Sequence, residues 1–174
     1  MSVRLFVALD LPAEARAALA AFREEAADPE VWRPVPEASF HVTLAFIGHR
    51  EADDVARCAA ALVPVRVPAI LPLALGRALL LSRVLTVAVE DPSGGLGEVQ
   101  AGVSDALARA GVYEPEARRF RPHVTVGRLR KGARPPRRIA GAPEPVAFRG
   151  GPVVLYRSVL GRGPADYERL WSSG

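Results

Sequence analysis

Two short segments with the pattern His-x-Thr are the places in this sequence where side chains could do chemistry. They are His41-Val42-Thr43-Leu44 and His123-Val124-Thr125-Val126. If each segment is a strand, its His and Thr point to one face and its central valine to the other. Two imidazoles can be one charged and one neutral near neutral pH, so that one accepts a proton while the other donates one. Two hydroxyls can donate hydrogen bonds to phosphate oxygens, so the set suits a phosphate ester without a metal.

The two motifs repeat together with the segments that precede them. Leu5–Asp10 matches Leu85–Glu90 at an offset of 80 residues, and the His-x-Thr motifs recur at an offset of 82. Two copies of strand, helix and His-x-Thr strand indicate an internal duplication, with lobes of approximately residues 1–80 and 81–174 in a single domain. Exchange of strands between the lobes stays open. A lone motif is more often a structural histidine beside a core, whereas a duplicated one favours chemistry.

Other reactive side chains fit structural roles better. No Asp or Glu lies within either His-x-Thr strand, which disfavours a metal site, and no cofactor is expected. Cys58 is expected as a small packed hydrophobe within a helix, and His49 as a surface turn residue. A single cysteine cannot form an intramolecular disulfide. Together with the lack of an export signal, it predicts the cytoplasm.

The elements expected around the motifs are strands and helices in alternation. Apolar runs predict strands at 3–9, 40–47, 69–75 (an edge strand), 79–81, 84–90, 120–129, 146–149 and 153–160. Helical spacing predicts helices at 12–27, 51–62 and 95–110, and residues 167–171 are expected as a short tail.

Composition limits the class of protein. The 174 residues are 49% hydrophobic and 24% charged, which favours one domain, excludes a disordered chain and offers no stretch for a membrane span. Between residues 117 and 143 there are nine basic residues and no acid, whereas the rest of the chain holds 14 basic and 19 acidic residues. This asymmetry favours a surface that faces a polyanion, and a solvated Arg-rich loop is the alternative.

Taken together, these segments resemble the 2H phosphoesterases, and among them the bacterial and archaeal RNA 2′,3′-cyclic phosphodiesterases, historically called 2′-5′ RNA ligases. The likeness covers nearly the whole chain and lies in Arg4-Leu5-Phe6-Val7-Ala8-Leu9, Phe40-His41-Val42-Thr43-Leu44-Ala45-Phe46-Ile47-Gly48, Arg121-Pro122-His123-Val124-Thr125-Val126 and Leu155-Tyr156-Arg157-Ser158-Val159-Leu160.

The resemblance implies a two-lobed α+β fold, a pseudo-twofold duplication in which two antiparallel sheets form a central cleft with helices outside. It also implies metal-independent hydrolysis of an RNA 2′,3′-cyclic phosphate to a 2′-phosphate, with 2′-5′ ligation as the reverse reaction. By likeness the site residues are His41 and His123 for catalysis, Thr43, Thr125 and Arg128 for the phosphate, and Phe46 for stacking on the terminal base. We expect His123 as the base and His41 as the acid.

Two of these roles conflict with simple strand alternation. Phe46 and Arg128 fall on the opposite face from the His and Thr of their strands, so either a bulge re-aims them or one assignment is wrong. Gly127 could host such a bulge in the second strand. For Phe46, a place in the core is the alternative to base stacking.

The expected partners are RNA ends or nucleotides with a 2′,3′-cyclic phosphate, bound by a monomer without a membrane. Further residues considered for RNA contact are Arg119, Arg121, Arg130, Tyr156 and Arg157. A non-catalytic RNA- or nucleotide-binding module is the alternative from another class. A phosphodiesterase for small cyclic phosphates or 2′-5′ oligoadenylate is the enzymatic one.

Overall fold

The computed structural model describes residues 2–159 and 166–174 of the chain. Its elements in chain order are β1 (Ser2–Asp10), α1 (Ala13–Ala26), β2 (Trp32–Pro34), a short 3-10 helix (Glu37–Ser39), β3 (His41–Glu51), α2 (Asp54–Leu62), β4 (Pro72–Leu81), β5 (Val84–Glu90), α3 (Gly95–Arg109), β6 (His123–Leu129), β7 (Ala147–Arg149), β8 (Val153–Val159) and β9 (Asp166–Ser172). No helix among the described residues is long and apolar enough to cross a membrane.

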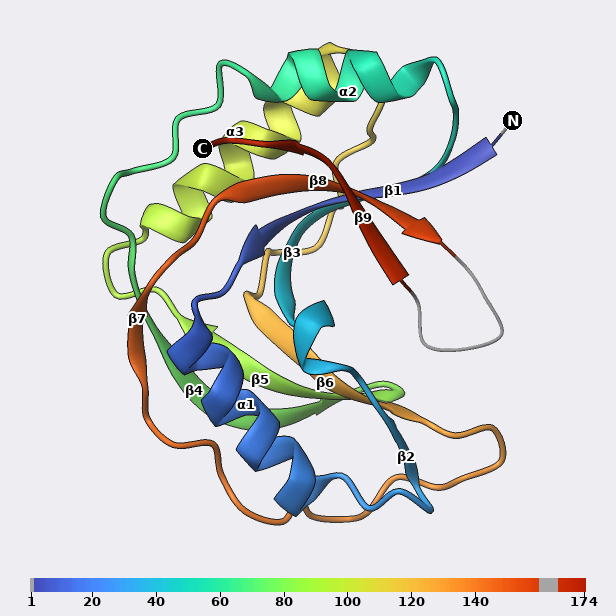
Figure 1. Ribbon diagram of the computed structural model, residues 1–174, viewed down its shortest axis with the longest axis vertical. Coiled ribbons are helices and arrows are strands. Elements are labelled where there is room, and N and C mark those ends of the chain that lie inside the picture. The colour runs from blue at the N-terminus through green and yellow to red at the C-terminus, as the bar shows by residue number, and fades with distance from the viewer. Residues whose placement is uncertain (1, 160–165) are drawn as a thin grey trace.

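The strands form one curled antiparallel sheet with helices on its outer side (Figure 1). The order is β7-β4-β5-β6-β3-β1-β8-β9, with β2 paired to β6. The α+β class is therefore confirmed, and the two expected antiparallel sheets are the two halves of this continuous sheet. The halves meet between β6 and β3 at one aligned residue pair, Val42 and Val124.

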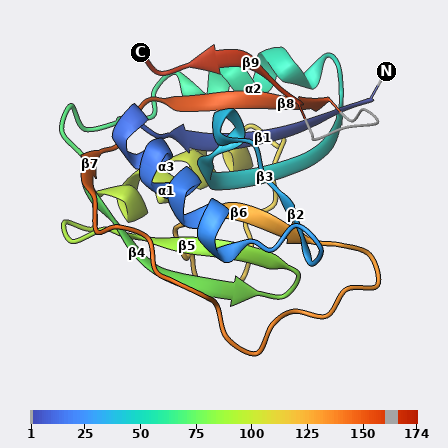
Figure 2. The ribbon, with the colours of Figure 1, turned by 60° about the horizontal axis from the view of Figure 1, so that its bottom comes forward.

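Elements from both ends of the chain contribute to each half. β8 and β9 extend the half that contains β1 and β3, and β7 extends the half that contains β4 and β5. The helix α1 follows β1 in sequence but packs against β6 and β7, whereas α3 follows β5 and packs against β3 (Figures 1 and 2). This interlacing fixes the two His-x-Thr strands relative to each other.

Strand β1 is buried on both faces, as its continuous apolar run predicts. Leu5, Val7 and Leu9 point into the main core. Phe6 and Ala8 point the other way, into a smaller cluster on the inner face of the sheet. Because β1 pairs with β3, this second cluster lies directly beside the first His-x-Thr motif.

Several boundaries differ from the sequence prediction. The prediction of a tail at 167–171 is wrong, since this stretch belongs to β9, which pairs with β8 at the edge of the sheet. Its charged residues concealed it, because exposed edge strands carry charge. The expected edge strand at 69–75 starts at Pro72, and β7 pairs outside it. The helix expected from residue 51 starts at Asp54 because β3 runs on to Glu51.

Two further predicted strand limits concern β6 and β8. The strand expected from residue 120 starts at His123. The final residue of the strand expected at 153–160, Leu160, lies outside the described residues.

Candidate active site

The two His-x-Thr motifs lie side by side on antiparallel strands. Val42 of β3 is aligned with Val124 of β6, and both valines are fully buried in the main core. In an antiparallel pair the residues that flank an aligned pair point to the opposite face of the sheet. The register therefore sets His41 across from Thr125 and Thr43 across from His123. All four side chains are half-buried on the inner face of the sheet.

A β-bulge follows the threonine in each motif and re-aims the strand end. In β3 the register with β1 shifts after Thr43, and in β6 the register with β5 shifts after Thr125. Each shift restores Phe46 and Arg128 to the face of the His and Thr side chains. The burial pattern is the same over residues 41–46 and 123–128. Phe46 is 45% exposed and is therefore not a core residue.

Both histidines present the same ring nitrogen to the site. Nδ1 of His41 donates to the carbonyl of Ser39 over 2.8 Å, and Nδ1 of His123 donates to the carbonyl of Arg121 over 2.7 Å. A carbonyl can only accept, so the neutral rings carry their proton on Nδ1 and leave Nε2 to gain or lose one. In the first motif Nε2 of His41 lies 3.1 Å from Oγ1 of Thr43.

Aromatic rings surround His41 on its β1 side. The ring centroid of His41 lies 4.9 Å from that of Phe6, 5.4 Å from that of Tyr167 and 6.5 Å from that of Tyr156. Burial among these rings lowers the pKa of His41 to about 4, although the Ser39 carbonyl and the Asp10 carboxylate oppose the shift. His41 is therefore neutral near pH 7 in the free protein.

A partly buried carboxylate network lies behind this ring. Asp10 is aligned with His41 across β1 and β3. Its carboxylate accepts hydrogen bonds from the Tyr156 hydroxyl at 2.6 Å and from the Arg169 guanidinium at 2.5 Å. Burial and the nearby Asp10 raise the pKa of Tyr156 to about 12. These contacts hold the Tyr156 ring in place and set negative charge close to His41.

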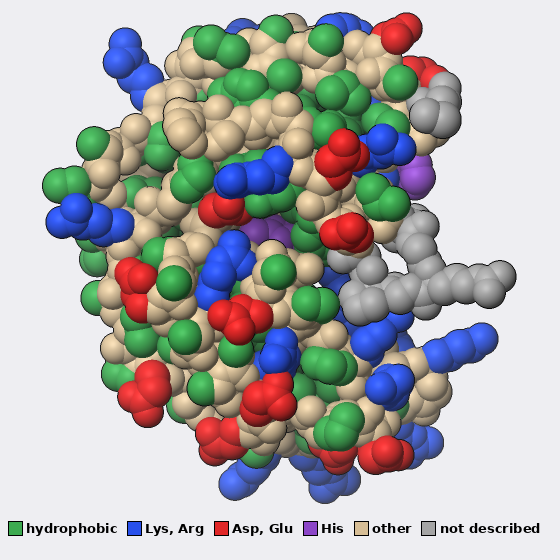
Figure 3. Space-filling view, viewed as in Figure 1, with side chains coloured by type: hydrophobic (Ala, Val, Ile, Leu, Met, Phe, Trp, Pro, Cys, Tyr) green, Lys and Arg blue, Asp and Glu red, His purple; other side chains and the backbone are tan. Residues whose placement is uncertain are grey.

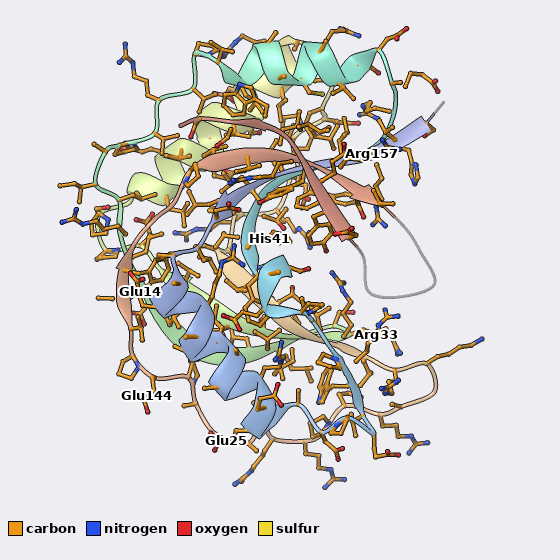
Figure 4. The ribbon with its side chains drawn as sticks, viewed as in Figure 1. Glu14, Glu25, Arg33, His41, Glu144 and Arg157 are labelled. Atoms are coloured by element: carbon orange, nitrogen blue, oxygen red, sulfur yellow. The ribbon has the colours of Figure 1, made fainter. Side chains whose placement is uncertain are left out.

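These groups open into a hollow of about 270 Å³, which we call the catalytic hollow. It is lined by residues from both halves of the sheet: Arg4, Phe6, Arg33, His41, Thr43, Phe46, Arg128, Ser158 and Tyr167. Figure 3 shows a histidine deep in the crevice, at the place where Figure 4 labels His41. His123 and Thr125 lie beside this hollow on the same sheet face, as the pairing of the two valines requires.

Sequence reasoning missed several of these lining residues. Tyr167 was missed because the sequence pattern predicts a tail, not a strand, at its position. Arg33 belongs to β2, which pairs with β6 only through tertiary contacts and sets Arg33 beside Arg128. Arg4 lies over the Phe46 ring, with its guanidinium carbon 4.9 Å from the ring centroid. The one sequence signal for Arg4 as a lining residue was its charge in an otherwise apolar strand.

The residues considered for RNA contact are scattered. Arg119 and Arg121 are exposed before β6, and Arg130 is exposed after it. Arg157 lies on β8, where Figure 4 labels it, and it forms an ion pair with Glu168 at 3.6 Å. Tyr156 is only 9% exposed, and its hydroxyl is held by Asp10, so its ring supports His41 from within the aromatic cluster.

No metal-binding group is formed by the described part of the chain. In residues 2–159 and 166–174, no three His, Cys, Asp or Glu side chains come together to hold a metal ion. Cys58, a free thiol, is buried in α2. His49 lies at an exposed position, 3.3 Å from the Ser2 hydroxyl.

Comparison with known proteins shows the family of this chain. Residues 10–162 match the family described as the 2′-5′ RNA ligase superfamily. The RNA 2′,3′-cyclic phosphodiesterase of Escherichia coli (strain K12) is 34% identical over 124 residues, which are 71% of this chain and 70% of that protein. The chain belongs to the 2′-5′ RNA ligase superfamily of 2H phosphoesterases, and it is an enzyme of that family.

Solved structures show the same fold. The crystal structure of E. coli LigT complexed with 3′-AMP superposes with a TM-score of 0.83 at 30% identity and covers 99% of this chain and 98% of that one. The crystal structure of TT0787 of Thermus thermophilus gives a TM-score of 0.74 at 28% identity and covers 97% and 96% of the two chains.

Proposed function

We propose that this enzyme hydrolyses the 2′,3′-cyclic phosphate at the end of an RNA chain to a 2′-phosphate, with His123 as general base and His41 as general acid. The observation that carries the proposal is the alignment of Val42 with Val124, which brings two imidazoles and two hydroxyls onto one sheet face. The E. coli relative named RNA 2′,3′-cyclic phosphodiesterase supports this choice of substrate.

The reaction uses the Nε2 atoms of the two histidines on opposite sides of the phosphate. Nε2 of His123 takes a proton from water as the water oxygen bonds to phosphorus. The bond from phosphorus to the 3′ oxygen breaks, and that oxygen takes the proton from Nε2 of His41. The product keeps its phosphate on the 2′ oxygen. Joining a 5′-hydroxyl to the cyclic phosphate through a 2′-5′ bond uses the same groups in the same roles, with the 5′-hydroxyl in place of water: His123 takes its proton and His41 protonates the departing 3′ oxygen.

An acid role for His41 requires that its proton return when substrate binds, because its pKa in the free protein is about 4. The negative charge of a cyclic phosphodiester beside Nε2 supplies that effect, since a nearby anion raises the pKa of an imidazole. The aromatic rings around His41 enlarge this rise in pKa, because an apolar environment screens the attraction between the imidazolium and the phosphate poorly.

Charge that develops on the phosphoryl oxygens needs donors, and Thr43, Thr125 and Arg128 supply them in the proposal. Arg128 reaches the catalytic hollow from β6, and Thr43 reaches it from β3. The exposed ring of Phe46 provides a face on which the terminal base can stack, while Arg4 covers the ring from one side.

The test uses a cyclic-phosphate RNA in which sulfur replaces the 3′ oxygen. A thiolate leaves without a proton, so the general acid becomes dispensable while the base stays necessary. We expect His41→Ala to recover most of its lost rate on the sulfur substrate and His123→Ala to recover none. His49→Ala is the matched control and retains the wild-type rate on both substrates.

Each other outcome has a defined meaning. Rescue of His123→Ala instead would reverse the two roles. Binding of the oxygen substrate without turnover by the wild-type protein would favour the non-catalytic module. Turnover of small cyclic phosphates or 2′-5′ oligoadenylate in preference to RNA would favour the enzymatic alternative.

The proposal also concerns the molecule in its cell. One chain supplies both His-x-Thr motifs, so the site is complete in a monomer, which we propose as the working form. The buried, unpaired Cys58 supports a cytoplasmic location, where thiols stay reduced.

A further inference from the structure

A second, wider hollow of about 820 Å³ adjoins the catalytic one and carries four positive charges. It is lined by Arg33, Arg83, Leu129, Arg130, Lys131 and Gly132, and no acidic side chain is among its lining residues. We call it the basic hollow. Three segments far apart in sequence form it: β2, the turn between β4 and β5, and the end of β6. Lys and Arg side chains gather on this side of the molecule (Figure 3, lower right).

Backbone contacts hold two of the four cationic side chains of the basic hollow in place. The Arg83 guanidinium donates to the carbonyl of Arg130 over 3.0 Å, and Arg130 Nε donates to the carbonyl of Pro29 over 2.7 Å. None of the four cations forms an ion pair with a described carboxylate. Their charge is therefore free for an anion from solution.

The two hollows are continuous through Arg33, which lines both. Arg33 is aligned with Arg128 across β2 and β6, and Leu129 and Arg130 follow Arg128 directly. In the view of Figure 4, Arg33 lies between His41 and the loop that follows β6. If the 3′ end of an RNA chain occupies the catalytic hollow, the upstream part of that RNA can run along this cationic edge.

The basic stretch of the sequence is consequently two separate surfaces. Residues 118–121 precede β6 and residues 130–138 follow it, and the seven residues of β6 separate the two groups by about 20 Å. Arg118 forms an ion pair with Glu116. The second surface adjoins the basic hollow, since Arg130 and Lys131 line it, and this hollow shares Arg33 with the catalytic one.

We propose that the basic hollow is a subsite for the internucleotide phosphates just upstream of the RNA end, with Arg83 and Lys131 as its determinants. The inference rests on the proposed function and deepens it, since it makes an RNA chain rather than a mononucleotide the preferred substrate. Contacts to phosphates carry no base information, so the subsite adds affinity without sequence preference.

The test compares a mononucleotide 2′,3′-cyclic phosphate with a decamer that ends in the same group. We expect the double variant Arg83→Ala/Lys131→Ala to lower the decamer-to-mononucleotide ratio of kcat/KM about tenfold at low salt. Binding of a labelled decamer is measured in parallel. The slope of log affinity against log salt should become shallower by about 1.4, because each lost contact to single-stranded RNA removes about 0.7.

Arg109→Ala is the matched control, an exposed arginine at the end of α3 that lines neither hollow. It keeps the wild-type ratio and slope. An unchanged ratio in the double variant, or a loss found only in Arg119→Ala/Arg121→Ala, would overturn the subsite. If the wild-type enzyme hydrolyses neither substrate, the proposed function fails. The salt slope of decamer binding then still decides the subsite by itself.

Discussion

The two His-x-Thr motifs share a backbone and differ in their surroundings. Each has its histidine Nδ1 bonded to the carbonyl two residues earlier, and each has a β-bulge after its threonine. The offset of 82 residues that aligns the histidines also aligns Phe46 with Arg128. The duplicated backbone thus delivers an aromatic ring in one copy and a guanidinium in the other to the same face of the sheet.

The difference lies in what the neighbouring strands bring. Beside the first motif, β1, β8 and β9 supply Phe6, Tyr156 and Tyr167, which surround His41. Among the described residues, no aromatic ring packs in this way against His123. Beside the second motif, β2 supplies Arg33. The first copy therefore places an exposed aromatic ring and a desolvated histidine at the site, and the second copy places guanidinium groups there.

The largest expected effect tests the shared part of this comparison. His41→Ala and His123→Ala should each lower kcat by about 10²- to 10⁴-fold on a cyclic-phosphate RNA, because each removes one proton transfer from the transition state. Phosphorus NMR in excess EDTA follows conversion to the 2′-phosphate. A variant with nearly wild-type kcat would show that only one of the two motifs is catalytic. His49→Ala controls for loss of a histidine elsewhere.

The next effect separates the two residues that the duplication aligns. Arg128→Ala should lower kcat by about 10²- to 10³-fold, as expected for a donor to developing phosphoryl charge. Phe46→Ala should instead raise KM, by about 5- to 150-fold, since stacking on a base is worth ~1–3 kcal/mol. Steady-state kinetics on one RNA substrate measures both. Equal changes in kcat for the two variants would show that Arg128 and Phe46 do not have the separate roles of phosphate donor and base-stacking ring.

The local part of the fold and site could be predicted from the sequence, because it depends on local pattern. The strand periodicity, the repeat and the His-x-Thr pairs were all readable, and they locate His41 and His123. Which strands flank each motif depends on pairing between distant segments. The sequence therefore did not reveal that Tyr167 and Arg33 line the catalytic hollow, or that β2 and β9 are strands at all.

The two β-bulges are a feature that the sequence allows but that only the pairing of distant strands locates. Strict alternation placed Phe46 and Arg128 on the wrong face, and the sequence allowed a bulge without locating it. One extra residue per strand reverses the facing of every later side chain. The register shifts against β1 and β5, which are tertiary pairings, locate the bulges.

A smaller effect concerns the surroundings of His41. Its pKa is about 4 in the folded protein, below the ordinary 6.5, so folding excludes a proton that the unfolded chain binds. This contribution to stability is complete above pH 6.5 and is lost as the pH falls towards 4. We expect the free energy of unfolding to fall by about 3 kcal/mol over that pH range.

Urea unfolding at several pH values measures this loss as a difference between proteins. The fall in free energy of unfolding between pH 7 and pH 4 should be shallower in His41→Ala than in the wild type by about that amount. His123→Ala tests whether the effect belongs to the aromatic surroundings of the first motif. A slope reduced equally in both variants would refute the contrast between the two histidines.

The smallest expected effect concerns the bulge itself. Gly127 stands in the second bulge where Ala45 stands in the first, so the shared backbone already accepts a methyl group there. A Cβ on Gly127 would meet Leu85 at 3.6 Å and Trp32 at 3.7 Å, which are ordinary contacts. Gly127→Ala should therefore change the free energy of unfolding by less than about 1 kcal/mol and leave Arg128 in place.

Kinetics and urea unfolding of Gly127→Ala decide between two origins of the bulge. An unchanged kcat with nearly unchanged stability means that the register of β6 between β2 and β5 sets the bulge, as in the copy with alanine. A loss of kcat as large as that of Arg128→Ala would mean that glycine is required to turn Arg128 toward the phosphate. The two motifs would then share their shape for different reasons, because Ala45 in the first bulge has no such freedom.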